Sequence, residues 1–287
     1  MKAKRILVKI SAVLLVVAIV VVSVVYYVLQ TSVSYGKYPF SYETGMLRTI
    51  DGKYIFDSGS SGTIFSERNA KYRRIGRAKS TDCNGVSVQS PYYYISQIEV
   101  QPNLWIKNIF CSIAPLRDTY TDNKLSGILG MDVISRANWH FSFKDSVLDI
   151  MDLHQIMNVP YSAVELQYYR RKYPLVSVKI EDFMVDSVLI DFGCFRDFCF
   201  TTEYIQRVLK QHPSIRPQKD SVNGSFSSQK VKTYQFNKLR VEDMCFLNLT
   251  IDEFTKNLIG GAFFSRFDHL FWDSRHKKVY LWNEEEK

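Results

Sequence analysis

Two short segments of this chain, each ending an apolar run with an Asp-x-Gly triplet, constrain its fold more than any other feature. The first covers Tyr54–Gly59 and contains Asp57, and the second covers Val188–Gly193 and contains Asp191. Asp and Gly are common turn formers, so either triplet alone would indicate only a turn. Two carboxylates brought together by a duplicated fold are, by contrast, what acid–base activation of water requires.

Further landmarks recur around both triplets in the same order, at offsets of 130 to 139 residues. A Tyr-Pro-apolar triplet precedes each Asp, and an Asn-Gly pair, an apolar-apolar-Gly triplet and a Ser-Arg pair follow it. This recurrence predicts two copies of one lobe. The landmarks are Tyr38-Pro39-Phe40 and Tyr173-Pro174-Leu175, Asn84-Gly85 and Asn223-Gly224, Ile128-Leu129-Gly130 and Leu258-Ile259-Gly260, and Ser135-Arg136 and Ser265-Arg266.

The N-terminus carries an uncharged apolar stretch, residues 10–29, which is long enough to cross a bilayer as one helix. Basic residues precede it, so the positive-inside rule places residues 1–9 in the cytoplasm and the chain from about residue 31 outside. We expect a signal anchor in the inner (cytoplasmic) membrane, with the folded part on the periplasmic side. The alternative is a cleaved signal peptide, which would release the protein into the periplasm.

Charge and cysteine content narrow the range of partners and cofactors. The net charge is +8, but Lys2, Lys4, Arg5 and Lys9 supply four of these charges, so we expect no nucleic-acid partner. The histidines are scattered and no Cys-x-x-Cys pair exists, so we expect no metal and no other cofactor. Cys194 and Cys199 are close enough in sequence for a small-loop disulfide after export. Cys111 and Cys245 lie in strand-like runs, where burial as small apolar residues is the alternative to oxidation. The cysteines are Cys83, Cys111, Cys194, Cys199 and Cys245.

Short apolar runs separated by turn signals predict an all-β fold of two lobes, 36–152 and 165–285. The Asn-Gly pairs lie between alternating runs, so we expect a β-hairpin around 82–88 in the first lobe and another around 221–227 in the second. Helices are expected to be short, with a Ser or Thr at the start of each. They are predicted at residues 66–73 and 203–211.

These residues also carry a resemblance to a known family. Asp57–Ser66 resembles the catalytic loop of pepsin-type and retropepsin-like aspartic proteases, and Gly127–Asp132 resembles the element that threads under that loop. The layout of residues 36–285 is similar to that of single-chain, two-lobed retropepsin-like proteins of Bacteroidota. The resemblance implies an aspartic-protease (acid protease) fold behind a transmembrane helix, and activity as a membrane-anchored aspartic endopeptidase.

The resemblance further implies that a water held between Asp57 and Asp191 attacks a peptide carbonyl while the two carboxyls share one proton. The implied partner is a peptide or protein substrate lying extended under the hairpins of a monomeric chain. The residues implied to support the catalytic loops are Ser58, Gly59, Ser60, Phe192, Gly193, Gly130 and Gly260. The hairpin residues implied to contact substrate are Asn84, Gly85, Val86, Asn223, Gly224 and Ser225.

The second loop departs from the family, which has Thr or Ser after each catalytic Asp. Ser58 has the hydroxyl that locks the two loops together, but Phe192 has none, and Cys194 stands where Ser60 stands in the first loop. Asp191 then has fewer donors for its charged form, which predicts that it is the protonated member and that Asp57 is the base. The alternative is an inactive peptide- or protein-binding module, in which Phe192 splays the loops apart.

Overall fold

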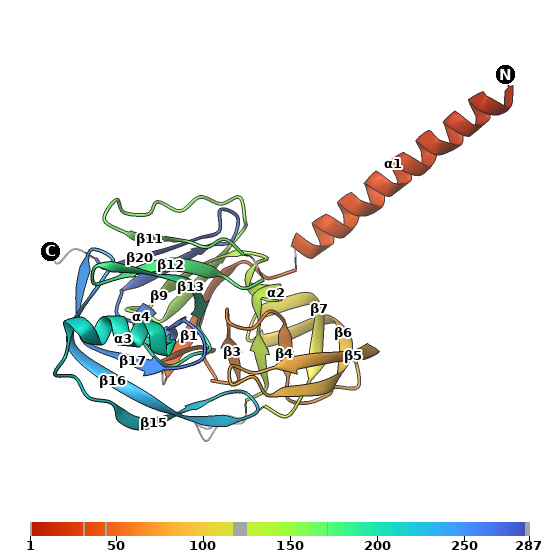
Figure 1. The fold of residues 1–287 in the computed structure, drawn as a ribbon. Coiled ribbons are helices and arrows are strands. Elements are labelled where there is room, and N and C mark those ends of the chain that lie inside the picture. The colour runs from red at the N-terminus through yellow and green to blue at the C-terminus, as the bar shows by residue number, and fades with distance from the viewer. Residues whose placement is uncertain (1, 31, 44, 117–124, 171, 285–287) are drawn as a thin grey trace.

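The computed structural model is mostly β-structure with one long N-terminal helix (Figure 1). The last residue of the predicted second lobe, 285, and the first residue of the predicted cytoplasmic segment lie outside the described residues. The described residues are 2–30, 32–43, 45–116, 125–170 and 172–284.

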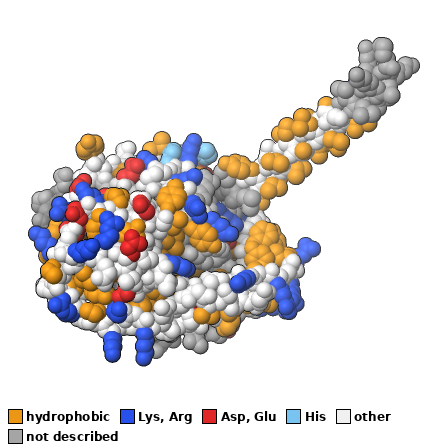
Figure 2. Space-filling view, in the orientation of Figure 1, with side chains coloured by type: hydrophobic (Ala, Val, Ile, Leu, Met, Phe, Trp, Pro, Cys, Tyr) orange, Lys and Arg blue, Asp and Glu red, His pale blue; other side chains and the backbone are white. Residues whose placement is uncertain are grey.

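The long helix α1 (Lys2–Gln30) projects from the β-structure without packing against it over most of its length (Figure 1). Lys9–Val28 is long and apolar enough to cross a membrane, and none of this stretch is buried against the rest of the protein. Apolar side chains cover the projecting helix (Figure 2). The predicted anchor is therefore a single apolar helix, and its sidedness and retention stay predictions.

The first half of the chain folds into ten strands and a one-turn helix. Its strands begin just after α1 and end where the connection to the second half starts. The elements are β1 (Gly36–Glu43), β2 (Met46–Thr49), β3 (Tyr54–Phe56), β4 (Thr63–Phe65), β5 (Arg73–Thr81), β6 (Ser87–Gln101), β7 (Leu104–Ile113), β8 (Gly127–Leu129), α2 (Met131–Ile134), β9 (Asn138–Ser142) and β10 (Val147–Met151).

The second half repeats this order, with one longer helix added after its fourth strand. Its elements are β11 (Val164–Gln167), β12 (Leu175–Ile180), β13 (Phe183–Asp191), β14 (Phe198–Phe200), α3 (Thr202–Gln211), β15 (Gln218–Asn223), β16 (Ser228–Val241), β17 (Met244–Glu253), β18 (Leu258–Gly260), α4 (Gly261–Phe264), β19 (His269–Asp273) and β20 (Lys278–Trp282).

The two halves join through an antiparallel run of strands in the order β11-β20-β19-β9-β10-β1. The central pair is β9 with β19, which sets Trp139 beside Trp272. Both Trp side chains are buried, and one large apolar core extends through both halves. This shared sheet fixes the two halves against each other because three strands of the second half, β11, β20 and β19, continue directly into three strands of the first half, β9, β10 and β1.

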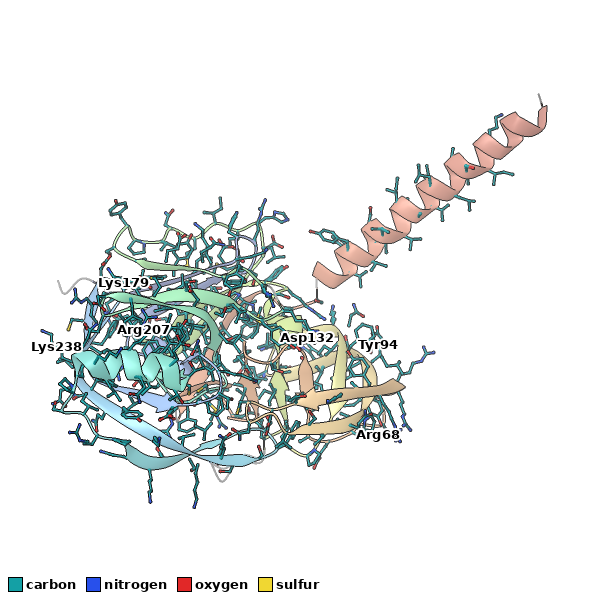
Figure 3. The ribbon with its side chains drawn as sticks, in the orientation of Figure 1. Arg68, Tyr94, Asp132, Lys179, Arg207 and Lys238 are labelled. Carbon is teal, nitrogen blue, oxygen red and sulfur yellow. The ribbon has the colours of Figure 1, made fainter. Side chains whose placement is uncertain are left out.

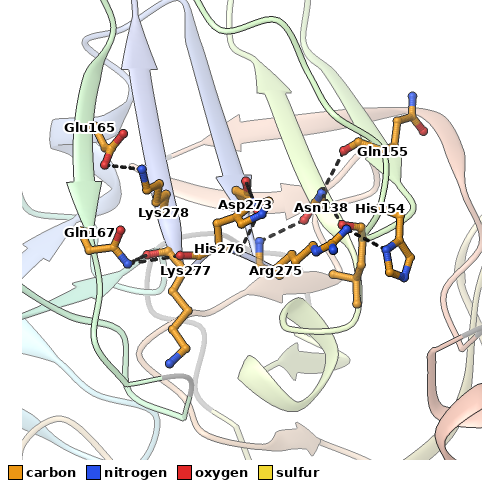
Figure 4. A network of polar contacts seen from close by, with 12 residues as sticks. Asn138, His154, Gln155, Glu165, Gln167, Asp273, Arg275, His276, Lys277 and Lys278 are labelled. Carbon is orange, nitrogen blue, oxygen red and sulfur yellow. Dashed lines mark hydrogen bonds and ion pairs between the residues drawn. The ribbon is translucent and has the colours of Figure 1, made fainter.

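Polar contacts fasten the connection between the halves to this sheet (Figure 4). The buried Asn138 amide donates to the carbonyl of Gln155 at 3.3 Å, and its Oδ1 accepts from the Ser274 amide at 3.0 Å. Lys278 Nζ lies 2.7 Å from Glu165 Oε1 on the neighbouring strand β11. Strand β11 was not expected from the sequence, and it lies at the very start of the predicted second lobe.

The arginine of each Ser-Arg pair makes equivalent hydrogen bonds in the two halves. Arg136 donates to the carbonyls of Lys107 at 2.8 Å and Asn108 at 3.2 Å, which lie on β7. Arg266 donates to the carbonyls of Leu247 and Asn248 on β17, each at 3.0 Å. Each arginine thus ties the turn after its short helix to a long strand of its own half.

The helix predicted at residues 66–73 is wrong, whereas the one predicted at 203–211 is confirmed as α3. The chain after β4 makes turns and enters β5 at Arg73. Ser66, expected to cap a helix, instead directs its amide (2.9 Å) and its hydroxyl (3.3 Å) to the carbonyl of Ser126. Tyr72 then packs against the aromatic side chains of the first half rather than on a helix face.

Candidate active site

The Asp-x-Gly triplets lie at equivalent places in the two halves. Asp57 follows β3 and Asp191 ends β13, and each of these strands runs parallel to the apolar-apolar-Gly strand of its own half. The Asp57 amide donates to the carbonyl of Leu129 at 2.9 Å, and Asp191 is in register with Gly260. The chain therefore delivers each carboxylate at the end of a strand that pairs with the apolar-apolar-Gly strand of its own half.

Gly130 and Gly260 have no side chain, so the loop that follows each Asp can pass in direct contact with them. A Cβ on Gly130 would lie 2.7 Å from the backbone of Gly62, and one on Gly260 would lie 2.1 Å from the carbonyl oxygen of Arg196. Just beyond these glycines, the Met131 amide donates to the Ser60 carbonyl at 2.8 Å and the Gly261 amide to the Cys194 carbonyl at 2.6 Å. Each Asp loop is thus tied to its own apolar-apolar-Gly element.

The glycines of the two triplets bring the loops of the two halves into reciprocal contact. A Cβ on Gly59 would lie 2.3 Å from Cγ of Asp191, and a Cβ on Gly193 would lie 2.5 Å from Cγ of Asp57. No other residue type fits there, because real Cβ atoms do not approach that closely. The glycines therefore let each carboxyl group rest on the backbone of the opposite loop.

A hydrogen bond joins the carboxyl groups of Asp57 and Asp191. Burial raises the pKa of Asp57, against the lowering effect of Asp191 and of the Ser60 and Gly59 amides. The pKa of Asp191 is raised well above its usual range, first by burial and then by the Asp57 charge, with only the Gly193 amide lowering it. These directions agree with the expectation that Asp191 carries the shared proton, which stays a prediction.

Ser58 bridges the two loops from beneath. Its hydroxyl donates to the carbonyl of Ile190 at 2.8 Å and accepts from the amide of Phe192 at 3.0 Å. Ser58 is fully buried, so both bonds are made in a site without competing water. This is the loop-locking role that the resemblance implied for it.

Phe192 does not lie between the carboxyl groups. Its ring is 1% exposed and packs edge-to-face on Phe264 (5.2 Å), Trp272 (5.3 Å) and Phe141 (6.1 Å). The expectation that Phe192 splays the loops is therefore wrong: its backbone amide is held by Ser58, and its side chain points into the core below.

Ser60 and Cys194 occupy equivalent positions but make different contacts. The Ser60 amide donates to Asp57 Oδ1 at 3.0 Å, and its hydroxyl donates to the Gly62 carbonyl at 2.7 Å within the same loop. The Cys194 and Cys199 thiols are hydrogen-bonded to each other, and all five cysteines are free. The disulfide considered for this pair is thus not formed in the structure.

The two hairpin tips meet over the carboxyl groups. Asp82, only 6% exposed, accepts bonds from the Ser227 hydroxyl at 2.6 Å, from the Phe226 amide at 3.2 Å and from the Val86 amide at 2.9 Å. The Asn84 amide group donates to the Ser227 hydroxyl at 3.0 Å. These contacts join the first-half hairpin to the second-half hairpin. Asp82 and Ser227 were not predicted as site residues. The only sequence signal for them was their position beside the two predicted hairpin turns.

The first hairpin turn matches its prediction, and the second is displaced. Gly85, at φ +83°, closes the turn between β5 and β6, beside Val86. In the second hairpin Asn223 is still the last residue of β15, and the turn runs from Gly224 to Ser227. Gly224 lies against the first hairpin, since a Cβ there would be 2.7 Å from Asp82 Oδ2. Ser225 lies within the displaced turn and, like Gly224, lines the cavity.

One cavity of about 580 Å³ contains both carboxyl groups and is lined by both halves. The lining includes most residues implied by the resemblance, but not Ser58 or Phe192, which lie beneath it, nor Gly130, Gly260, Asn84, Gly85 and Val86. In the part of the chain that the structure describes, no group of three or more His, Cys, Asp or Glu side chains is arranged to hold a metal ion. The cavity brings the carboxyl groups of Asp57 and Asp191 together with side chains of both halves.

No family model matches this sequence, and no curated protein matches it in sequence. The function of the site is therefore inferred from the geometry of the site itself.

Proposed function

We propose that the protein is an aspartic endopeptidase of the two-lobed acid-protease fold, held at a membrane by α1. The observation that carries this proposal is the reciprocal packing of each Asp-x-Gly glycine on the opposite carboxyl group, at the base of a cavity lined by both halves. Two hydrogen-bonded carboxyl groups with unequal surroundings are suited to sharing one proton.

In the proposed reaction, the ionised Asp57 carboxylate takes a proton from a water molecule as that water attacks the peptide carbonyl carbon. Asp191, protonated, transfers its proton to the carbonyl oxygen as negative charge develops there, which gives a tetrahedral diol. Asp57 then gives its proton to the leaving amine as the C–N bond breaks, and Asp191 takes a proton back from one hydroxyl as the product carboxyl group forms. The buried Ser58 bridge keeps the two carboxyl groups within reach of one water by holding the loops together.

The test is cleavage of a peptide library by the full-length protein in detergent, with Asp57→Asn compared with the wild type. General-base catalysis contributes about 10²–10⁴-fold, so the variant should lose at least that much in kcat. Asp243→Asn, at an exposed turn between β16 and β17, is the matched control and should cleave as the wild type does. Cleavage that survives Asp57→Asn at the wild-type rate overturns the proposal.

A peptide-binding module without hydrolysis is the second candidate, and the asymmetry of the loops favours it. Only the first loop contributes a bridging hydroxyl, and the hairpin tips are hydrogen-bonded across the cavity entrance. This candidate predicts saturable peptide binding with no cleavage at any pH, a result that the same library measured by fluorescence anisotropy would reveal.

A further inference from the structure

The cavity is not symmetric, and its second-half end has a distinct chemical character. Leu175, Leu189 and Leu258 lie in register on the neighbouring strands β12, β13 and β18, and all three line the cavity. Leu189 is two residues before Asp191 on one strand, so the two side chains emerge on the same face. A row of leucines therefore crosses the sheet two residues before Asp191, on the face that carries its carboxyl group.

Beyond this row, two cationic side chains reach the same end of the cavity. Arg170 and Lys256 are both exposed and both line it. Side-chain contacts of their sequence neighbours hold both segments at one place: Tyr169 Oη lies 3.1 Å from Ser187 Oγ, and Asn257 Nδ2 donates to the Asp186 carbonyl at 3.2 Å. Ser187 itself lines the cavity between them.

No carboxylate balances these cations within the cavity, among the residues that the structure describes. The acidic side chains lining it are Asp57, Asp191 and Asp82. The first two are hydrogen-bonded to each other, and Asp82 is engaged by the opposite hairpin. The outer end of the leucine row is thus an uncompensated positive site next to an apolar wall.

We propose that this end of the cavity selects substrates carrying a carboxylate, beyond an apolar side chain that lies on the leucine row. The inference rests on the proposed function and names its substrate class: a peptide with an aliphatic residue beside the scissile bond and a carboxylate farther out on the same side. Asp, Glu or a free chain terminus supplies the same chemistry, and the experiment below separates these sources.

The experiment measures kcat/KM of the full-length protein in detergent on matched peptides. One series differs only in Asp, Glu, Asn or Gln at each position on either side of the cleavage site. A second has that position as the last residue, with a free or an amidated terminus. Exposed ion pairs are weak, so we expect about 1.5- to 5-fold per cation in favour of the carboxylate at one position, with the preference falling as salt rises.

Arg170→Gln and Lys256→Gln should each remove about 1.5- to 5-fold of that preference and together nearly all of it, while Asn-containing peptides are cleaved as before. Lys238→Gln is the control, because Lys238 is exposed on β16, is not among the cavity residues and lies by α3 at the outer edge of the second half (Figure 3). It should leave the preference intact.

The outcomes separate the two proposals. Asp57-dependent cleavage without any carboxylate preference, or a preference unchanged in the double variant, overturns this inference and leaves the proposed function standing. Absence of all cleavage overturns the proposed function, and the selectivity is then decided by binding of the same peptides to the wild-type protein. Equal affinity for the Asp and Asn peptides in that assay overturns the inference as well.

Discussion

The loops of Asp57 and Asp191 have the same backbone framework and different side-chain support. In both, the strand before the Asp pairs with an apolar-apolar-Gly strand, and the residue three after it accepts a bond from the chain just beyond that glycine. The first carboxyl group is followed in sequence by Ser58 and accepts bonds from two backbone amides. The second is followed by Phe192 and accepts a bond from one backbone amide.

This difference shows that the second carboxyl group reaches the junction of the halves without a bridging hydroxyl from its own loop. Phe192 fills the core beneath the junction instead of bonding across it, and Ser58 supplies the bridge from one side. The side-chain asymmetry instead affects protonation, because the group with fewer donors holds its proton more tightly. The following predictions test this comparison, from the largest expected effect to the smallest.

Asp191→Asn should lower kcat by about 10²–10⁴-fold, because the variant has no carboxyl proton to place on the substrate carbonyl. The measurement is steady-state cleavage of the best peptide across pH, beside Asp243→Asn as the exposed control. Activity in Asp191→Asn equal to that of the wild type would remove Asp191 from the mechanism and leave the first half alone responsible.

Phe192→Thr should lower the free energy of unfolding by about 3–5 kcal/mol, since truncating a buried aromatic ring leaves a cavity among its neighbours. Chemical denaturation of the detergent-solubilised protein measures this. Phe110→Thr is the control, because that ring is 42% exposed, and it should cost about 1 kcal/mol or less. A Phe192→Thr variant as stable as the control would mean that the second loop is not anchored by this ring.

Ser58→Ala should cost about 1–3 kcal/mol of stability, because it leaves the buried amide of Phe192 without an acceptor. We expect the rate to fall as well, as the loops lose their bridge, and Ser58→Thr to restore both. Ser60→Ala is the matched control, since its hydroxyl bonds within its own loop. If Ser58→Ala and Ser60→Ala behave alike, the bridge does not distinguish the two loops.

The pH–rate profile should be bell-shaped, with both limbs above the ordinary Asp range because both pKa values are raised. Activity falls about tenfold per pH unit on the acid side as Asp57 gains a proton, and on the alkaline side as Asp191 loses one. Because the pKa of Asp191 is raised in the folded protein, protonated Asp191 stabilises the fold. This contribution to the free energy of unfolding is complete below the pKa of the unfolded chain and is lost as the pH rises through the pKa of the folded protein. A profile with no alkaline limb would contradict the assignment to Asp191.

Local patterns predicted much of this architecture. Hydrophobic periodicity and turn-forming residues predicted the positions of the Asp-x-Gly repeat, the apolar-apolar-Gly triplets and the Asn84-Gly85 turn. These features were predictable because each depends on residues adjacent in sequence. Helix α3 was predicted from the same kind of signal. Ser66 is also a capping type of residue, but it donates instead to the carbonyl of Ser126, which lies just before β8. Competition from a partner sixty residues away is invisible to a local pattern.

The sequence by itself determined that the chain carries an apolar N-terminal helix and a duplicated β-unit with an Asp-x-Gly in each copy. Only the tertiary structure decided that each glycine rests on the opposite carboxyl group, that Phe192 turns into the core, and that Asp82 reaches Ser227 across the cavity. The physical reason is that these contacts join residues more than 50 positions apart. Their geometry is set by how the shared sheet docks the two halves, which no local preference encodes.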